Sequence, residues 1–250
     1  TDGCSWPVAQ TRPRMRLARF GPGGGEQRAE LDRNGRLRDA SALVDDITID
    51  ALERLADADP EQLPFVPEAA RLGVSVAGTR KFTAIGLNYT DHARESEMPI
   101  PAEPIIFMKA VTCLAGPHDD VPLPVGSTKT DWEIELGIVT SRQARYVDEA
   151  AALDHVAGYV LVNDLSERED QLERGGTWDK GKGHDGFGPV GPWLVTRDEL
   201  GEADNLAMVL SVNGIIRQDG NTSNMIFGVR QIVSYVSRFM TLEPGDIIAT

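Results

Sequence analysis

Two glutamates separated by a single residue are the strongest chemical signal in the sequence. Glu133 and Glu135 belong to the segment DWEIEL, in which charged and apolar residues alternate as in a strand. Alternate side chains of a strand share a face, so both carboxylates point the same way while Ile134 and Leu136 face the core. Adjacent carboxylates repel each other unless a cation, a proton or solvent intervenes. The pair indicates either a site for a hard cation such as Mg²⁺, Mn²⁺ or Ca²⁺ or a solvated strand face.

A third carboxylate follows a second predicted strand. Asp164 comes two residues after the apolar run GYVLV and could complete a three-carboxylate site. Arg168, one helical turn later, could face the same cavity and bind a carboxylate. In the alternative interpretation Asp164 is the N-cap of a helix over SEREDQLER. Taken alone, this motif favours the cap.

Lys182 lies in a glycine-rich segment, residues 176–189, that matches neither common phosphate-binding pattern. Glycines there allow the backbone to pass close to a ligand. Lys182 would then place an ammonium group beside a substrate carboxylate or a developing enolate. An ordinary surface lysine is the alternative.

His92 and Glu95 are three residues apart in GLNYTDHARE, so on a short helix they share a face. A glutamate beside a histidine raises the basicity of the imidazole, which suits a base that activates water. A surface pair is the alternative. The other three histidines lack an acidic companion at helical spacing, and we expect them to be structural: His118, His155 and His184.

These residues need a framework of strands. From Lys81 onward, short β-branched and aliphatic runs alternate with glycine and proline turns, and the clearest helical pattern is VRQIVSYVSRFMTL, residues 229–242. The pattern predicts a β-rich, mixed α+β fold whose catalytic domain, residues 79–250, has a sandwich-like or barrel-like β core.

Residues 15–78 are predicted to form a small N-terminal α/β domain. The segment MRLARFG has a strand pattern, Asn34-Gly35 indicates a hairpin, and residues 49–58 have helical spacing. We expect Met15 to be the natural start and residues 1–14 to be a disordered or non-native extension.

The charge balance excludes some partners. Lys and Arg number 25 against 39 Asp and Glu, which gives a net charge of −14 and argues against binding to nucleic acid. No apolar run approaches the roughly 20 residues that span a bilayer. With two cysteines and no signal-peptide pattern, we expect a cytoplasmic protein without a membrane partner.

Seven segments resemble the fumarylacetoacetate hydrolase family in order and spacing, from Lys81 to Thr250, with a weaker match from Met15. They are GLNYTDHARE, PIIFMK, DWEIELGIV, GYVLVNDLSERE, GKGHDGFGPVGPWLVT, NGIIRQDGNTSNMIF and LEPGDIIAT. The sequence is most similar to the small members, such as acylpyruvate hydrolases and 2,4-dioxo-3-deoxy-rhamnonate hydrolases.

The resemblance implies roles for individual residues. It implies that the metal ligands are Glu133, Glu135 and Asp164, with Mg²⁺ or Mn²⁺ as the cofactor. It implies that the catalytic residues are His92, Glu95 and Lys182, and that the substrate-binding residues are Arg168, Gln171 and Lys182. Asp91 matches an additional carboxylate ligand that smaller members do without, so its role stays open.

The implied reaction is hydrolysis of a carbon–carbon bond in a 2,4-dioxo acid, which yields pyruvate and a second acid. Two other reactions on the same scaffold are alternatives: decarboxylation of an oxaloacetate-type 2-oxo acid and isomerisation of a 2-hydroxy-dienoate. A non-catalytic protein that binds metal or ligand is the alternative of another class.

The resemblance also implies a homodimer. Family members continue beyond the segment that matches GDIIAT, so we expect the sequence to be truncated after Thr250.

Overall fold

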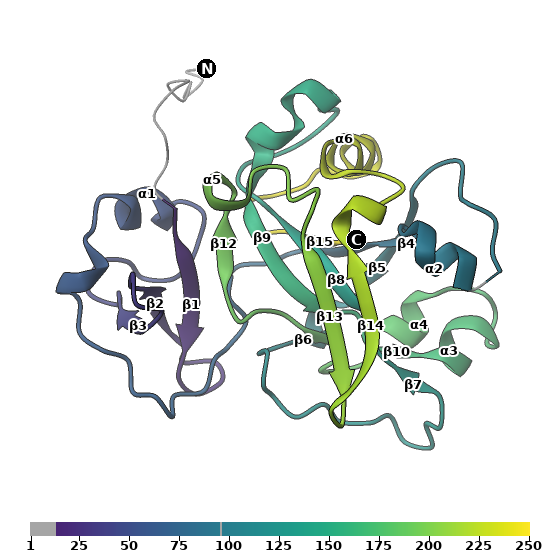
Figure 1. Cartoon of the computed structure of the whole chain (residues 1–250), viewed down its shortest axis with the longest axis horizontal. Coiled ribbons are helices and arrows are strands. Elements are labelled where there is room, and N and C mark those ends of the chain that lie inside the picture. Colours follow the sequence, from purple (N-terminus) through teal and green to yellow (C-terminus); the bar gives the residue numbers. More distant parts are fainter. Residues whose placement is uncertain (1–13, 96) are drawn as a thin grey trace.

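The computed structural model describes residues 14–95 and 97–250 (Figure 1). The predicted extension over residues 1–14 lies outside the described residues except for Arg14. The main feature is a nine-stranded sheet with the order β3-β2-β1-β12-β9-β8-β15-β4-β5. In that order its strands are Leu37–Asp39, Gln27–Leu31, Arg16–Phe20, Leu194–Thr196, Val156–Asn163, Ile134–Thr140, Ile247–Ala249, Phe82–Gly86 and Ile105–Lys109.

The sheet separates two hydrophobic cores, as alternation along its central strands requires. In β9, Val160 and Val162 belong to one core, whereas Tyr159 belongs to the other. The second core also receives the helix α6 (Val229–Phe239). Helix α6 buries the apolar stripe that the sequence predicts, with Ile232 fully buried. The predicted β-rich, mixed α+β fold with a packed β core is therefore confirmed.

The N-terminal strands extend the same sheet. Strand β1 pairs with β12, with Leu17 opposite Leu194. The predicted hairpin at Asn34-Gly35 joins β2 to β3, and Gly35 has a positive φ of 74° that favours glycine. The predicted helix over residues 49–58 is α1 (Ala51–Ala56), followed by η1 (Pro60–Gln62). A domain boundary after residue 78 stays a prediction.

Short elements surround the ends of β8 and β9. Figure 1 shows the helices α2, α3 and α4 grouped on the side of the molecule away from β1–β3. The elements that position the site are α2 (Thr90–Glu95), β7 (Thr130–Asp131), β10 (Ser166–Glu167), α3 (Arg168–Leu172), α4 (Asp179–Lys182), β13 (Ala207–Val212) and β14 (Ile215–Asn221). The remaining elements are η2 (Val111–Cys113), β6 (Leu114–Ala115), η3 (Glu149–His155), β11 (Gly188–Pro189), α5 (Arg197–Leu200) and η4 (Thr222–Asn224).

None of the helices formed by the described residues is long and apolar enough to cross a bilayer.

Candidate active site

Three carboxylates meet where β8 begins and β9 ends. Glu133, Glu135 and Asp164 each contribute an oxygen, and these oxygens lie within 4.8 Å of one another. The antiparallel register places Ile134 opposite Asn163. The amide N of Asp164 then donates to the carbonyl O of Glu133 over 2.8 Å. The pairing of the two strands thus brings together residues that are about thirty positions apart.

Asp164 does not cap the helix that follows it. Helix α3 begins at Arg168, and its N-cap is Glu167, whose side chain accepts from the amide N of Asp170 over 2.8 Å. The interpretation that the motif alone favoured is therefore wrong. The two-residue strand β10, which ends at Glu167 and pairs with β7, lies between Asp164 and the helix, so the helix starts later than predicted.

Two buried lysines surround the Asp164 carboxylate. Nζ of Lys182, on α4, donates to Oδ2 of Asp164 over 2.6 Å and also to Oε2 of Glu133. Nζ of Lys109, at the end of β5, lies 2.6 Å from Oδ1 of Asp164 in an ion pair without hydrogen-bond geometry. Lys109 also donates to the carbonyl O of Lys182. It fixes Asp164 and the backbone of α4 together, a role that the sequence did not indicate.

The electrostatic environment shifts the pKa values of the two glutamates in opposite directions. Burial raises the pKa of Glu133, but the Lys182 and Arg168 charges outweigh it and lower that pKa to about 2. Burial, together with repulsion from Asp164 and Glu133, raises the pKa of Glu135 well above its usual value. Burial disfavours the charged form of Lys182, yet the surrounding carboxylates raise its pKa.

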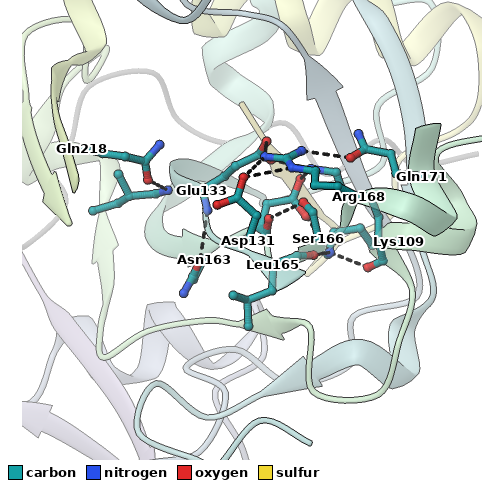
Figure 2. A network of polar contacts seen from close by, with 12 residues as sticks. Lys109, Asp131, Glu133, Asn163, Leu165, Ser166, Arg168, Gln171 and Gln218 are labelled. Atoms are coloured by element: carbon teal, nitrogen blue, oxygen red, sulfur yellow. Dashed lines mark hydrogen bonds and ion pairs between the residues drawn. The ribbon is translucent and has the colours of Figure 1, made fainter. Parts of the chain in front are cut away.

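Arg168 is held by the carboxylates of Asp131 and Glu133 (Figure 2). Its guanidinium donates to Asp131 Oδ2 over 2.8 and 3.0 Å and to Glu133 Oε1 over 2.7 Å. Its Nη1 donates to Oε1 of Gln171 over 2.9 Å. Both side chains line the cavity above the carboxylates, while their role in binding substrate stays a prediction. Arg168 also orients Glu133, because it bonds one oxygen of that carboxylate while Lys182 bonds the other.

The carboxylates fit a hard divalent cation. Oε2 of Glu135 is buried and has no hydrogen-bond partner among the described residues. A buried carboxylate oxygen without a donor is costly, and a cation would satisfy it. Oxygen ligands of this kind suit Mg²⁺ or Mn²⁺.

A cavity of about 720 Å³ opens over the carboxylates. His92 and Glu95, on the exposed face of α2, line it together with Asp91. The Asp91 carboxylate bonds the amide N of His92 over 3.0 Å and Nδ2 of Asn224 over 3.1 Å. The structure brings His92 and Glu95 to the same cavity as Lys182, while their pairing stays a prediction.

The glycine-rich segment forms the short helix α4. A Cβ on Gly181 would lie 2.6 Å from the amide N of Gln171, so glycine is needed for the close approach of α4 to α3. Here glycine accommodates another helix rather than a ligand, and this approach buries Lys182. Next to it, Trp178 packs edge-on against Phe107 and lines the cavity.

His184 has an acidic partner that helical spacing could not reveal. Its Nε2 lies 3.1 Å from Oδ2 of Asp170, which precedes it by fourteen positions. The pair joins α3 to the segment after α4 and does not line the cavity.

Comparisons with known proteins find a matching family, similar sequences and similar folds. Residues 81–250 match the family described as Fumarylacetoacetate (FAA) hydrolase C-terminal. A 2,4-didehydro-3-deoxy-L-rhamnonate hydrolase from Sphingomonas sp. is 54% identical over 236 residues, which cover 94% of this chain and 83% of the relative.

Two solved structures have similar folds. A fumarylacetoacetate hydrolase from Exiguobacterium antarcticum superposes with a TM-score of 0.82 at 31% identity, covering 94% of this chain and 86% of the other. A 5-carboxymethyl-2-hydroxymuconate delta-isomerase from Mycobacterium smegmatis gives a TM-score of 0.74 at 30% identity, with the same coverage.

Proposed function

The chain belongs to the fumarylacetoacetate hydrolase family, and from that premise we propose that it is a divalent-metal-dependent hydrolase that cleaves a carbon–carbon bond in a 2,4-dioxo acid. The observation that carries the proposal is the group of Glu133, Glu135 and Asp164 beside the buried ammonium of Lys182. This arrangement combines a site for a hard cation with a cationic donor for an anionic substrate.

Glu133, Glu135 and Asp164 are the residues that would hold the cation. When bound, Mg²⁺ or Mn²⁺ would supply Lewis-acid polarisation of the 2-oxo acid end of the substrate. Lys182 would stabilise negative charge on the enolate oxygen as the bond breaks, because its ammonium is buried and fixed in direction. Arg168 and Gln171 would orient the same end of the substrate.

His92 is proposed as the base that activates water. It would take a proton from water while the oxygen attacks the C4 carbonyl, and Glu95 would stabilise the resulting imidazolium. The bond between C3 and C4 then breaks, its electron pair stays on C3 as pyruvate enolate, and the other fragment leaves as an acid. Protonation of C3 gives pyruvate. Both side chains line the cavity, which supports this assignment.

Isomerisation of a 2-hydroxy-dienoate is the second candidate. The Mycobacterium smegmatis structure named 5-carboxymethyl-2-hydroxymuconate delta-isomerase has a TM-score of 0.74 with this chain. Such a reaction needs proton transfer but no attacking water. Oxaloacetate decarboxylation and non-catalytic binding are the remaining alternatives, and both would use the same cation site.

Steady-state turnover of acetylpyruvate, oxaloacetate and a 2-hydroxy-dienoate, each with Mg²⁺, Mn²⁺ or EDTA, tests the proposal. We expect metal-dependent release of pyruvate from acetylpyruvate, reduced at least about a hundredfold in His92→Ala. Arg94→Ala on the same helix is a matched control outside the cavity lining. Turnover of oxaloacetate or dienoate alone, or near-normal hydrolysis by His92→Ala, would contradict it.

The homodimer implied by the resemblance stays a prediction. Light scattering coupled to size-exclusion chromatography tests it directly.

A further inference from the structure

Helix α2, which carries His92, is bonded at its first turn to the residues that follow β14. Oδ2 of Asp91 accepts from Nδ2 of Asn224 over 3.1 Å, and Oδ1 of Asp91 accepts from the amide N of His92 over 3.0 Å. One carboxylate therefore bonds the 3₁₀-helix η4 with one oxygen and the backbone of the proposed base with the other. A shift of Asn224 would move the backbone of His92 with it.

The residues just before α2 are bonded to the same segment. The side chain of Asn88 is buried, and its Oδ1 accepts from the amide N of Phe227 over 2.9 Å while its Nδ2 donates to the carbonyl O of Phe227 over 3.2 Å. The carbonyl O of Asn88 also accepts from the amide N of Ile226 over 2.7 Å. Residues 88–91 and 224–227 thus lie side by side, joined by side-chain and backbone hydrogen bonds.

The other end of this segment reaches the carboxylates. In β14, Oε1 of Gln218 accepts from the amide N of Ile134 over 2.8 Å (Figure 2). Ile134 lies between Glu133 and Glu135 in sequence, and β14 leads directly into η4. Residues 218–227 therefore connect the backbone between the two proposed metal ligands with the start of the helix that carries the proposed base.

The contacts of Asp91 differ from those of the proposed metal ligands. Among the described residues, the group of carboxylates that could hold a cation consists of Glu133, Glu135 and Asp164 and does not include Asp91. Both oxygens of Asp91 accept hydrogen bonds within the chain, whereas Oε2 of Glu135 has no partner among those residues. The Asp91 carboxylate is thus placed to hold backbone and side-chain donors rather than a cation.

We propose that Asp91 and Asn224 are positioning residues that fix His92 relative to the cation site. They act through the backbone of His92 and do not touch the reacting atoms. This role rests on the proposed function, since it assumes that His92 activates water there. Loss of the bond should lower kcat more than it changes KM, because the substrate would bind through its 2-oxo acid end at the cation and Lys182.

An exchange of the two side chains tests the pair. Asn224→Asp removes the donor and brings two carboxylates together, so kcat for acetylpyruvate should fall at least about tenfold while KM changes about twofold or less. In the double variant Asp91→Asn/Asn224→Asp, the new amide donates to the new carboxylate, and its oxygen still accepts from the amide N of His92. Its kcat should return to within about threefold of the wild-type value.

Three further measurements separate positioning from general damage. In a His92→Ala background, Asn224→Asp should lower the residual kcat about twofold or less, because the base is already absent. By mass spectrometry, amide hydrogens of residues 90–95 should exchange faster in Asn224→Asp and at the wild-type rate in the double variant. Calorimetry should show unchanged Mn²⁺ binding in Asp91→Asn, whereas loss of a ligand would weaken it at least about tenfold.

Ser223→Ala is the matched control. Ser223 is exposed on the same 3₁₀-helix as Asn224 and lies outside the cavity lining. The variant should leave kcat, KM and the exchange of α2 unchanged.

The outcomes distinguish the positioning role from the proposed function. A double variant as slow as Asn224→Asp, or an equal loss in Asn224→Asp with and without His92, overturns the positioning role and leaves the hydrolase function standing. Weakened Mn²⁺ binding in Asp91→Asn also overturns it, because Asp91 would then be a metal ligand. If the wild-type protein cleaves acetylpyruvate with neither Mg²⁺ nor Mn²⁺, the proposed function fails, and the positioning role falls with it.

Discussion

Asp32 in the N-terminal strands and Glu135 in the candidate active site are both carboxylates with buried oxygens, but only Asp32 has its donors in place. Its carboxylate accepts from the amides of Asn34 and Arg36 and from Nε of Arg38 over 2.8 Å. Burial raises the pKa of Asp32, but these donors outweigh it and lower the pKa to about 2. Glu135 has repelling carboxylates as neighbours instead, and its pKa is raised.

This difference distinguishes a structural network of hydrogen bonds from a candidate ligand-binding site. The Asp32 network is complete within the chain, so it stabilises the N-terminal hairpin and needs no ligand. The group around Glu135 is incomplete: Lys109, Lys182 and Arg168 contact Asp164 and Glu133, but Oε2 of Glu135 is buried without a hydrogen-bond donor among the described residues. A buried carboxylate oxygen without a donor is costly, and a bound cation would satisfy it.

The largest expected effect comes from neutralising Glu135. In Glu135→Gln, kcat/KM with Mg²⁺ should fall at least about a hundredfold, because a proposed metal ligand is lost. The same change should increase the free energy of unfolding in EDTA by about 1 kcal/mol, because a repelled carboxylate is removed. Enzyme assays and urea denaturation measure the two effects. A variant that is less stable in EDTA would show that Glu135 is structural, like Asp32.

Removal of Lys109 should destabilise the site. Lys109→Met leaves Oδ1 of Asp164 buried without its ion-pair partner, so the free energy of unfolding in EDTA should fall by about 3 kcal/mol. Lys129→Met is the matched control, because Lys129 pairs with Glu173 at the exposed surface and should cost less than about 1 kcal/mol. Equal losses in the two variants would contradict the role assigned to Lys109.

Glu30 shows that an unpaired carboxylate without like-charged neighbours can be satisfied by a proton. Burial raises the pKa of Glu30 to about 7, above its ordinary value of 4.5 in the unfolded chain. Its contribution to stability is therefore complete below pH 4.5 and is lost as the pH rises through 7. Between pH 5 and pH 8 the free energy of unfolding should decrease less in Glu30→Gln than in the wild-type protein, by up to about 3 kcal/mol. Urea denaturation at both pH values measures the two decreases. Equal decreases in the variant and the wild type would contradict the raised pKa of Glu30.

The smallest effect is expected at Asp32. Asp32→Asn removes an acceptor charge from Arg38 and should lower Tm by a few degrees while kcat/KM stays unchanged. Because the pKa of Asp32 is lowered, its contribution is present above its usual pKa and is lost as the pH falls toward 2. Calorimetry measures Tm. A variant with lower kcat/KM and an unchanged Tm would show that Asp32 is not a purely structural residue.

Features set by local sequence could be predicted. The alternation in DWEIEL predicted that both glutamates point the same way, and their oxygens do meet, although Glu133 lies just before β8. The apolar stripe predicted α6, and Asn34-Gly35 predicted the hairpin. Asp164 was found as a candidate, but its motif alone favoured a helix cap. The register of β8 and β9 decided otherwise, and a single sequence motif carries no information on register.

Features that depend on distant contacts could not be predicted. Lys109 ends an apolar strand, and nothing near it in sequence indicates Asp164 as its partner. Gln218 reaches Ile134 across 84 positions. Lys182 was singled out by its motif, yet its burial depends on the packing of Gly181 against α3. In each case the chemistry arises from packing between separate elements.

Calorimetric titration of Mn²⁺ into the EDTA-treated protein tests the central claim, that the incomplete carboxylate group is a divalent-cation site, most directly. We predict one ion bound per chain, with binding weakened at least about tenfold in Glu135→Gln and unchanged in Asp32→Asn. Absence of binding by the wild-type protein, or equal binding by wild type and Glu135→Gln, would contradict the account.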